Sequence, residues 1–376
     1  ATATTATFTW TVEWVGKRIS VVELSENEDM SNSQFYGSEE ELNKSEFVVT
    51  VNDLQPDTKY YYRFWVWNQS YVDNKFVMGT KYLTTSLLPQ TPTGAIDGIF
   101  SVSDEKRVWF SKGNLQCIGS GASSEYWKFA ENQWDVLGDN GNGQGSSYQY
   151  RNRDLFGWGT SGYHNSNDSH NRFYSPNSTS TSSYSSYDNK YGYGPSTSQS
   201  NPNIAGTEYD WGVHNKIYNG GNWVGLWRTL TSEEWNYLLN ERHTHIVNGT
   251  SNARFAKGRV NDVYGVILFP DDYSHPTDVS APIGINDRGK IGWDNNIFGE
   301  SDWAQMEAKG CVFLPTAGQR SGTSVYFVGT YGVYWSASYY DSSSAYSISF
   351  NDSDLNSQRF YYRYFGFAVR LVHNVH

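Results

Sequence analysis

The chain has 376 residues, of which 38% are hydrophobic and 17% aromatic, and its formal net charge is −11. So many aromatic side chains can fill a large core, which argues against global disorder despite a mean hydropathy of −0.64. The acidic balance, without a cluster of basic residues, argues against a nucleic-acid partner and against a polybasic membrane patch.

The sequence predicts neither a membrane-spanning segment nor a metal site. The longest apolar runs, such as 265–270, are too short to span a bilayer. No signal peptide is present, which we expect of a cytosolic protein or of a mature chain whose N-terminal anchor or leader has been removed. Cys117 and Cys311 could form one disulfide or remain two buried thiols. Neither the cysteines nor the eight histidines have metal-ligand spacing, so we expect no metal and no cofactor.

Residues 1–88 predict a small all-β domain. Phe8, Trp10, Val12 and Trp14 alternate with polar residues, as in a strand with one buried face. The run LQPDTKY, 54–60, resembles the tyrosine corner of fibronectin type III and other immunoglobulin-like sandwiches. This resemblance implies an immunoglobulin-like sandwich, and such domains often serve only as spacers.

A linker at 89–94, within the Pro- and Gly-containing stretch 86–94, leads to a second domain, 95–376. Its first stretch predicts a hairpin that turns at 104–106. The composition of 138–207 is rich in Gly, Ser, Asn and Tyr and predicts long, ordered, irregular loops rather than a disordered segment. Leu155, Phe156 and Trp158 are expected to pin these loops onto the core.

Helices and buried strands are predicted further along the second domain. Thr231 and Glu234 form a capping-box pattern ahead of a helix whose apolar face includes Trp235, Leu238 and Leu239. The apolar run 266–269 predicts a buried strand, and a short helix is expected between Ser301 and Gly310.

Several framework strings of this domain carry a family resemblance. LWRTLTSEEWNYLLNER, VFLPTAG, YWSAS and GFAVRLV resemble helix and strand segments of the formylglycine-generating enzyme family, which has a C-type lectin fold. With GNLQ, WKFAENQWDVLG, DLFGWGTSG and ILFPDD, the chain is more similar to a bacterial branch of that family, the variable proteins of diversity-generating retroelements. The resemblance covers most of 95–372 and implies an α+β C-type lectin fold with long irregular loops.

The resemblance also implies a variable region at about 321–367. In such retroelements, adenines of a template are copied with errors, so that asparagine codons can come to encode Tyr, Ser, Asp, Phe, Val, Arg or Gly. They cannot come to encode Lys, Glu, Gln, Met or Trp, and 321–367 contains no Lys, Glu or Met. The loop 138–207 has a similar composition, so the argument rests on the place of 321–367 at the end of this framework. Trp335 and Gln358 would then be unmutated framework.

Alternation along 345–350 predicts which side chains of this region face a ligand. Tyr346, Ile348 and Phe350 are predicted to face the core, and Ser347, Ser349 and Asn351 to face solvent. Trp335, Val369 and Leu371 are predicted core residues, and Arg370 a framework ion pair. The candidates for ligand contact are Tyr326, Phe327, Tyr331, Tyr339, Tyr340, Asp341, Ser342, Ser347, Ser349, Asn351, Asp352, Ser353, Arg359, Phe360, Tyr361, Tyr362, Tyr364, Phe365 and Phe367.

These candidates lead to two expectations about the surface. The first is that one group of them is exposed and close together, namely Tyr326, Phe327, Tyr339, Tyr340, Asp341, Ser347, Ser349, Asp352, Phe360, Tyr361 and Tyr362. The second is that seven rings form one exposed aromatic patch, namely Tyr339, Tyr340, Phe360, Tyr361, Tyr362, Tyr364 and Phe365. The alternative is that these rings pack beneath the 138–207 loops and complete the core.

The expected function is ligand binding without catalysis. Cys311 lies in an apolar strand pattern typical of an inert thiol, and no cysteine follows it, unlike in the enzymes of the family. No Glu-Pro-Asn or Gln-Pro-Asp string suggests calcium-dependent sugar binding. We expect an extracellular receptor or adhesin of a bacterial surface, whose partner is a protein or glycan on another cell or a host. The alternative is a carbohydrate-binding or pilus-tip adhesin without diversification.

Overall fold

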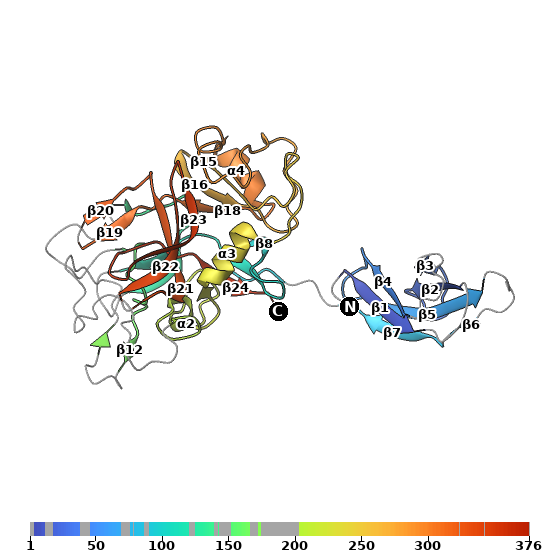
Figure 1. Ribbon diagram of the computed structural model, residues 1–376. Helices are drawn as coiled ribbons and strands as arrows, with labels where there is room; N and C mark the ends of the chain where they lie inside the picture. The colour runs from blue at the N-terminus through green and yellow to red at the C-terminus, as the bar shows by residue number, and fades with distance from the viewer. Residues whose placement is uncertain are drawn as a thin grey trace. The chain divides into compact units, whose positions relative to one another are not determined.

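The computed structural model describes residues 4–11, 18–37, 46–68, 76–77, 79–85, 90–119, 125–138, 142, 152–165, 172–173, 203–322, 324–341 and 343–375. The chain divides into two compact units, Ala1–Gln90 and Thr91–His376. Both are built mainly from β-strands (Figure 1). The predicted positions Val12, Trp14 and Ser342, and most of the loop 138–207, lie outside the described residues.

The first unit contains two sheets. One pairs β1 with β4, and the other has the order β3-β2-β5-β6, with β7 also paired to β5. The predicted alternation of β1 is confirmed, because Phe8 and Trp10 are buried while their neighbours are exposed. The strands of this unit are β1 (Ala6–Thr11), β2 (Arg18–Ser25), β3 (Gln34–Tyr36), β4 (Glu46–Val51), β5 (Lys59–Asn68), β6 (Phe76–Val77) and β7 (Lys81–Thr84).

The loop before β5 is closed by Tyr60. The backbone N–H of Gln55 donates to the Tyr60 hydroxyl at 2.9 Å, and both Leu54 and Tyr60 are buried. The hydrogen bond expected from the LQPDTKY run is therefore present, and it ties the hydroxyl to a backbone group five residues upstream.

The second unit contains three larger sheets and several short strand pairs (Figure 1). Its elements are β8 (Ala95–Ser101), β9 (Arg107–Ser111), β10 (Leu115–Ile118), β11 (Tyr126–Phe129), β12 (His164–Asn165), β13 (Arg172–Phe173), α2 (Trp211–His214), β14 (Arg228–Thr229), α3 (Ser232–Asn240), β15 (Phe255–Val260), β16 (Val263–Leu268), β17 (Ile297–Phe298), α4 (Glu300–Glu307), β18 (Val312–Pro315), β19 (Gln319–Ser321), β20 (Ser324–Tyr326), β21 (Gly332–Tyr339), β22 (Ser344–Phe350), β23 (Leu355–Tyr362) and β24 (Leu371–Asn374).

The sheets join distant parts of this unit. One sheet has the order β14-β24-β9-β8. In it, β24, the last strand of the unit, lies between β14 from the middle of the unit and β9 from its beginning. A second has the order β17-β15-β16-β18, and the third is the antiparallel sheet β21-β22-β23. The predicted hairpin that turns at 104–106 is confirmed as the antiparallel pair β8–β9. The short helix predicted after Ser301 is α4, which begins at Glu300, two residues earlier than expected.

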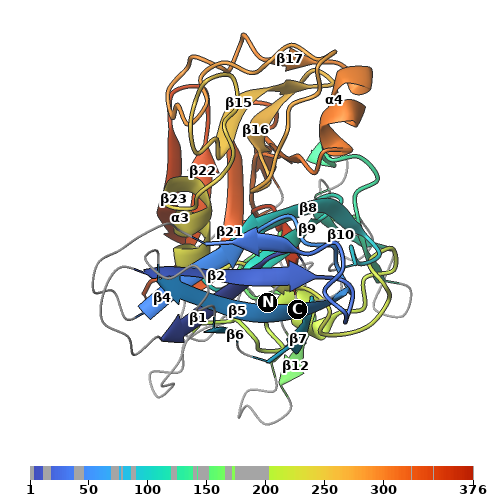
Figure 2. The same cartoon turned by 90° about the vertical axis from the view of Figure 1, so that its right-hand side faces the viewer.

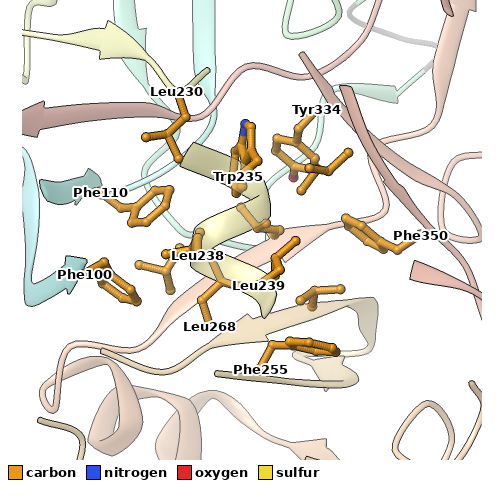
Figure 3. Packing of buried hydrophobic residues seen from close by; sticks show 14 of the residues in the cluster. Phe100, Phe110, Leu230, Trp235, Leu238, Leu239, Phe255, Leu268, Tyr334 and Phe350 are labelled. Carbon is orange, nitrogen blue, oxygen red and sulfur yellow. The ribbon is translucent and has the colours of Figure 1, made fainter. Parts of the chain in front are cut away.

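Helix α3 occupies the centre of one core cluster. The N–H of Glu234 donates to the Thr231 hydroxyl, and the N–H of Thr231 donates to the Glu234 carboxylate, so the predicted capping box is confirmed. The helix contacts β21, β22 and β23, beside which it lies in Figure 2. Figure 3 shows Trp235, Leu238 and Leu239 pointing among aromatic rings of the surrounding strands.

A second core cluster covers the opposite face of the β21–β23 sheet. It contains Trp335 and Phe367 together with Phe156 and Trp158, all of them fully buried. The prediction that the 155–158 segment packs onto the core is therefore confirmed. The β21–β23 sheet has apolar side chains on both faces, which limits how many of its residues can reach solvent.

The prediction of an ion pair at Arg370 is wrong. Its guanidinium is buried and donates to neutral acceptors, which are the Gln133 side-chain oxygen at 2.6 Å and the Phe313 carbonyl at 3.3 Å. Within the described ranges, no carboxylate forms an ion pair with it. Burial lowers the pKa of Arg370 to about 10, because the charged form loses hydration.

Candidate ligand-binding surface

The β21–β23 sheet places its two connecting turns far apart. Residues 340–343 join β21 to β22, and residues 351–354 join β22 to β23. The seven residues of β22 separate these turns by about 20 Å. Asp352 therefore lies at the opposite end of the strand from Tyr340. The expectation that both belong to one cluster is wrong, and the candidates Asn351 and Ser353 lie at the same end of the strand as Asp352.

At the 340–343 end, Arg363 fastens two loops together. Its backbone N–H donates to the Ser343 carbonyl at 3.0 Å, and its guanidinium donates to the Asp341 carbonyl at 2.6 Å. The guanidinium also lies 5.4 Å from the ring centroids of Trp158 and Tyr339. Because Arg363 is fully buried, these contacts hold the turn 340–343 against the residues that follow β23. No sequence pattern singled out Arg363, since it lies inside a run of tyrosines.

The candidate Asp341 acts within the turn. Its carboxylate accepts from the backbone N–H groups of Ser343 at 2.8 Å and Ser344 at 2.7 Å. Burial opposes ionisation here, but these hydrogen bonds outweigh it and lower the pKa of Asp341. The carboxylate is thus ionised at neutral pH and stabilises the turn, so a change at Asp341 alters the shape of the loop as well as its surface.

Three rings form a compact group, the ring stack, on the α3 side of the sheet. Tyr340 and Phe360 lie parallel with centroids 4.0 Å apart, and Tyr346 meets Tyr340 edge-on at 5.1 Å. Phe360 and Tyr346 are cross-strand partners. Tyr340 is 40% exposed and Phe360 47%, so two of the three rings present a broad surface to solvent. Tyr346, expected in the core, is only half-buried.

A longer group, the ring series, runs over the opposite face and around the end of β23. Most neighbouring members are joined by ring contacts with centroids 4.7 to 6.4 Å apart, while Tyr331 and Tyr361 are joined by a hydrogen bond between their hydroxyls and Tyr361 and Phe365 only through Phe367. The buried ring of Phe367 contacts both Tyr361 and Phe365 and links them. The ring series consists of Tyr326, Phe327, Tyr331, Tyr361, Phe365, Tyr364 and Tyr362.

Tyr362 brings the two groups of rings together. It lies two residues after Phe360 on β23, so the two side chains share a face of the strand. At the same time its ring stacks on Tyr364 at 5.3 Å, beyond the end of the strand. The aromatic surface therefore continues from the ring stack around the strand end into the ring series.

The prediction that Ser347 and Ser349 face solvent is wrong. Ser347 is 1% exposed and Ser349 5%. Both lie on the face of β22 that also carries Ala345, the partner of Tyr361. The Tyr331 hydroxyl forms a hydrogen bond with the Ser349 side chain. Burial is the main reason why the pKa of Tyr331 rises to about 12. Ser349 thus lies against Tyr331, and Ser347 lies beside the buried Trp335, its cross-strand partner, on the same face of the sheet.

The other candidates differ in how far they reach solvent. None of the seven rings expected in one patch is fully buried, whereas Phe367 is buried and can only support its neighbours. The exposed candidates are Tyr326, Phe327, Tyr340, Ser353, Arg359, Phe360 and Tyr362. The half-buried candidates are Tyr331, Tyr339, Asp341, Asn351, Asp352, Tyr361, Tyr364 and Phe365.

Phe327 combines an exposed ring with an unusual backbone. Its φ is +62°, and 58% of the residue is exposed. Bulky residues rarely adopt positive φ, and such strain persists where the surroundings hold it. Here the Phe327 carbonyl accepts from the N–H groups of Thr330 and Tyr331. The neighbouring Val328 is also exposed, and the sequence did not identify it because it is not aromatic.

The structure distinguishes between the disulfide and the two free thiols that the sequence allows for the cysteines. Cys117 and Cys311 are free and buried, so they do not form a disulfide. Burial raises the pKa of the Cys117 thiol to about 12 and that of Cys311 still further. Neither thiol is therefore ionised at neutral pH.

No three His, Cys, Asp or Glu side chains among the described residues gather where they could hold a metal ion. No helix in the described ranges has the length and apolar character needed to cross a lipid bilayer. No family model matches the sequence, and no curated protein matches it either.

Proposed function

We propose that the second unit is a ligand-binding module with a C-type lectin fold, and that the ring series and ring stack form its contact surface. The observation that carries the proposal is the parallel stack of Tyr340 on Phe360. These rings lie twenty residues apart in sequence, yet their centroids are 4.0 Å apart and the two residues are 40% and 47% exposed. Such a pair offers a large apolar area to a partner at a small loss of conformational entropy.

The support beneath this surface favours binding over a role in folding alone. The buried Arg363 holds the turn between β21 and β22 against the residues that follow β23, while Tyr340, Phe360 and Tyr362 are exposed to solvent. Binding sites commonly consist of loops held by a rigid scaffold. Tyrosine hydroxyls keep such a surface soluble until a partner covers it.

We further propose that a retroelement diversifies this surface. The exposed rings of the ring series and the ring stack are all Tyr or Phe, which mutated asparagine codons can encode. The residues beneath them include Trp335, which such codons cannot encode, and it is fully buried. A division between variable surface and constant core is what diversification without unfolding requires.

For the first unit, we propose an immunoglobulin-like sandwich that acts as a spacer, supported by the Gln55–Tyr60 hydrogen bond. For the whole chain, we propose display on the outer surface of a bacterial cell, where the ligand would be a protein or glycan of another cell or a host. The buried, unionised Cys311 supports binding rather than cysteine-based catalysis.

The diversification proposal is tested by sequencing the DNA around the coding region. We expect a second copy of the segment that encodes about 321–367, differing from it mainly where the copy has adenine, next to a reverse transcriptase gene. Absence of both would remove diversification and leave an adhesin with a fixed surface.

The binding proposal is tested with labelled protein on arrays of glycans and of extracellular proteins. A variant with Tyr340→Ser, Phe360→Ser and Tyr362→Ser should lose the array signals of the wild type. A control variant with Ile246→Ser and Ile291→Ser removes two other exposed apolar side chains and should keep them. Equal signals from the wild type and the triple variant would contradict the proposed contact surface.

A further inference from the structure

A second aromatic site lies outside the ring series and the ring stack. Tyr126 begins β11, and Tyr218 follows Ile217, which forms a parallel bridge with Trp127. The N–H of Tyr218 donates to the Trp127 carbonyl at 2.8 Å. This pairing brings the two tyrosine rings together at 6.0 Å, inclined by 70°. Both residues are exposed, Tyr126 by 44% and Tyr218 by 70%.

The two rings border an open pocket of about 420 Å³, the Tyr126–Tyr218 pocket. This volume is within the range of small-molecule sites. Beneath the rings, Trp127 and Ile217 are buried in the same core cluster as Trp211. The rings thus extend from a fixed base and not from a mobile loop.

Polar groups form the remaining wall of the pocket. The Asn215 amide nitrogen donates to the carbonyls of Ser161 at 2.8 Å and Trp211 at 3.0 Å, which fixes the plane of the amide. His214 is half-buried, and burial lowers its pKa although Glu208 opposes this effect. The imidazole is therefore neutral at pH 7 and carries one donor and one acceptor.

The charges at the pocket are balanced. Glu125 and Lys216 both line it, so the lining carries one acidic and one basic side chain and favours neither an anionic nor a cationic ligand. A phosphate or nucleotide site would call for several basic or backbone N–H groups. An apolar peptide would leave the polar wall unpaired. A pyranose ring has an apolar C–H face and hydroxyl groups that both donate and accept, which matches rings on one side and mixed polar groups on the other.

We propose that the Tyr126–Tyr218 pocket binds a neutral pyranoside, with the C–H face of the sugar stacked on one tyrosine ring and its edge against the other, which is inclined by 70°. Its hydroxyl groups then exchange hydrogen bonds with the polar wall around His214 and Asn215. This site shares no residue with the ring series or the ring stack, so it does not depend on the proposed diversified surface. It gives the chain a constant sugar contact in addition to a surface proposed to vary.

The test is saturation-transfer NMR on the full chain with the methyl glycosides of glucose, galactose, mannose and N-acetylglucosamine. We expect at least one glycoside to bind with a Kd of about 1 mM, with transfer strongest to its ring C–H protons. In the variant Tyr126→Ala/Tyr218→Ala, affinity should fall at least about tenfold. The variant Tyr126→Phe/Tyr218→Phe keeps both rings and should retain binding.

A third variant separates this site from the proposed ligand surface. Tyr340→Ala/Phe360→Ala changes the ring stack and should leave glycoside binding unchanged. Loss of binding in this variant, with retention in Tyr126→Ala/Tyr218→Ala, would move the sugar to the ring stack and overturn the inference. Absence of transfer to all four glycosides at about 20 mM, twentyfold above the expected Kd, would overturn it as well.

Discussion

Tyr334 and Tyr340 lie six residues apart in the chain, but they belong to different regions of the second unit. Tyr334 is fully buried and donates its hydroxyl hydrogen to the Pro315 carbonyl at 2.9 Å, whereas Tyr340 is 40% exposed and stacks only on surface rings. In the first region a polar atom can find a hydrogen-bond partner only within the protein, and in the second region water can supply one. The same residue type can therefore be indispensable at one site and replaceable at the other.

The largest effect is expected from the buried region. Trp335→Ala and Trp235→Ala should each lower the free energy of unfolding by about 3–5 kcal/mol, because both indoles are fully buried. Urea denaturation followed by circular dichroism measures the change. Midpoints that stay at the wild-type value in both variants would contradict the assignment of these residues to the core.

A matched pair of variants sharpens this expectation. The Trp335 indole N–H donates to the Phe156 carbonyl at 2.7 Å, whereas the buried N–H of Trp235 has no hydrogen-bond partner among the described residues. Trp335→Phe should therefore be more destabilising than Trp235→Phe, by about 1–3 kcal/mol.

The second prediction concerns the pH dependence of the buried region. Burial raises the pKa of Asp210 to about 6, although its carboxylate accepts from Thr229 and Gly212. The unfolded value is about 3.9, so between about pH 4 and pH 6 the folded state binds more protons than the unfolded state. The contribution of this group to stability is therefore full below about pH 4 and is lost as the pH rises through about 6.

Asp210→Asn removes this titration. Between pH 4 and pH 7 the wild type should lose on the order of 3 kcal/mol of stability relative to the variant. Urea midpoints of both proteins across this range measure the difference. Parallel curves for the two proteins would show that the Asp210 carboxyl has the same pKa in the folded and unfolded states.

The third prediction addresses the boundary between the two regions. Arg363→Met keeps the volume of the side chain but removes the charged hydrogen bond to the Asp341 carbonyl, which should lower stability by about 2 kcal/mol. The amide of Arg363, which bonds to the Ser343 carbonyl, should also exchange faster with solvent.

Arg359→Met is the control, because Arg359 is an exposed residue of β23, four positions before Arg363. It should change stability by no more than about 0.5 kcal/mol. Similar losses of stability in both arginine variants would show that Arg363 has no special role in holding the two loops together.

The fourth prediction concerns strain in the exposed region. Phe327→Asn should raise stability by about 1 kcal/mol, because asparagine adopts the φ of +62° more readily than phenylalanine. Tyr326→Asn, at the end of the regular strand β20, should give no such gain. Thermal unfolding of the two variants compares them, and a loss of stability at Phe327 would mean that its ring contacts outweigh the backbone strain.

The buried region could be predicted from the sequence to a considerable extent because its signals are local. The capping box at Thr231 and Glu234 and the corner at Tyr60 depend on residues only a few positions apart. The burial of Trp235 follows from its place on the apolar face of the helix, together with Leu238 and Leu239.

The exposed region was predicted less well because its geometry depends on distant side chains. Alternation along β22 assigns Ser347 and Ser349 to solvent, but Tyr331 lies against Ser349, and the buried Trp335 is the cross-strand partner of Ser347. Strand order also places Asp352 and Tyr340 at opposite ends of one strand, although both lie in hairpin turns. A period of two cannot show whether one or both faces of a sheet are covered.

The difference between the two regions is measured most directly by saturation mutagenesis of 321–367, with protease resistance of the displayed protein as the readout. Tyr326, Phe327, Tyr340, Phe360 and Tyr362 should tolerate most substitutions, within about 0.5 kcal/mol each. Tyr334, Trp335, Ile348 and Phe350 should tolerate few, and the buried Ser347 and Ser349 should behave like them. Equal intolerance at the exposed rings and at Trp335 would contradict a surface that is free to vary on a constant core.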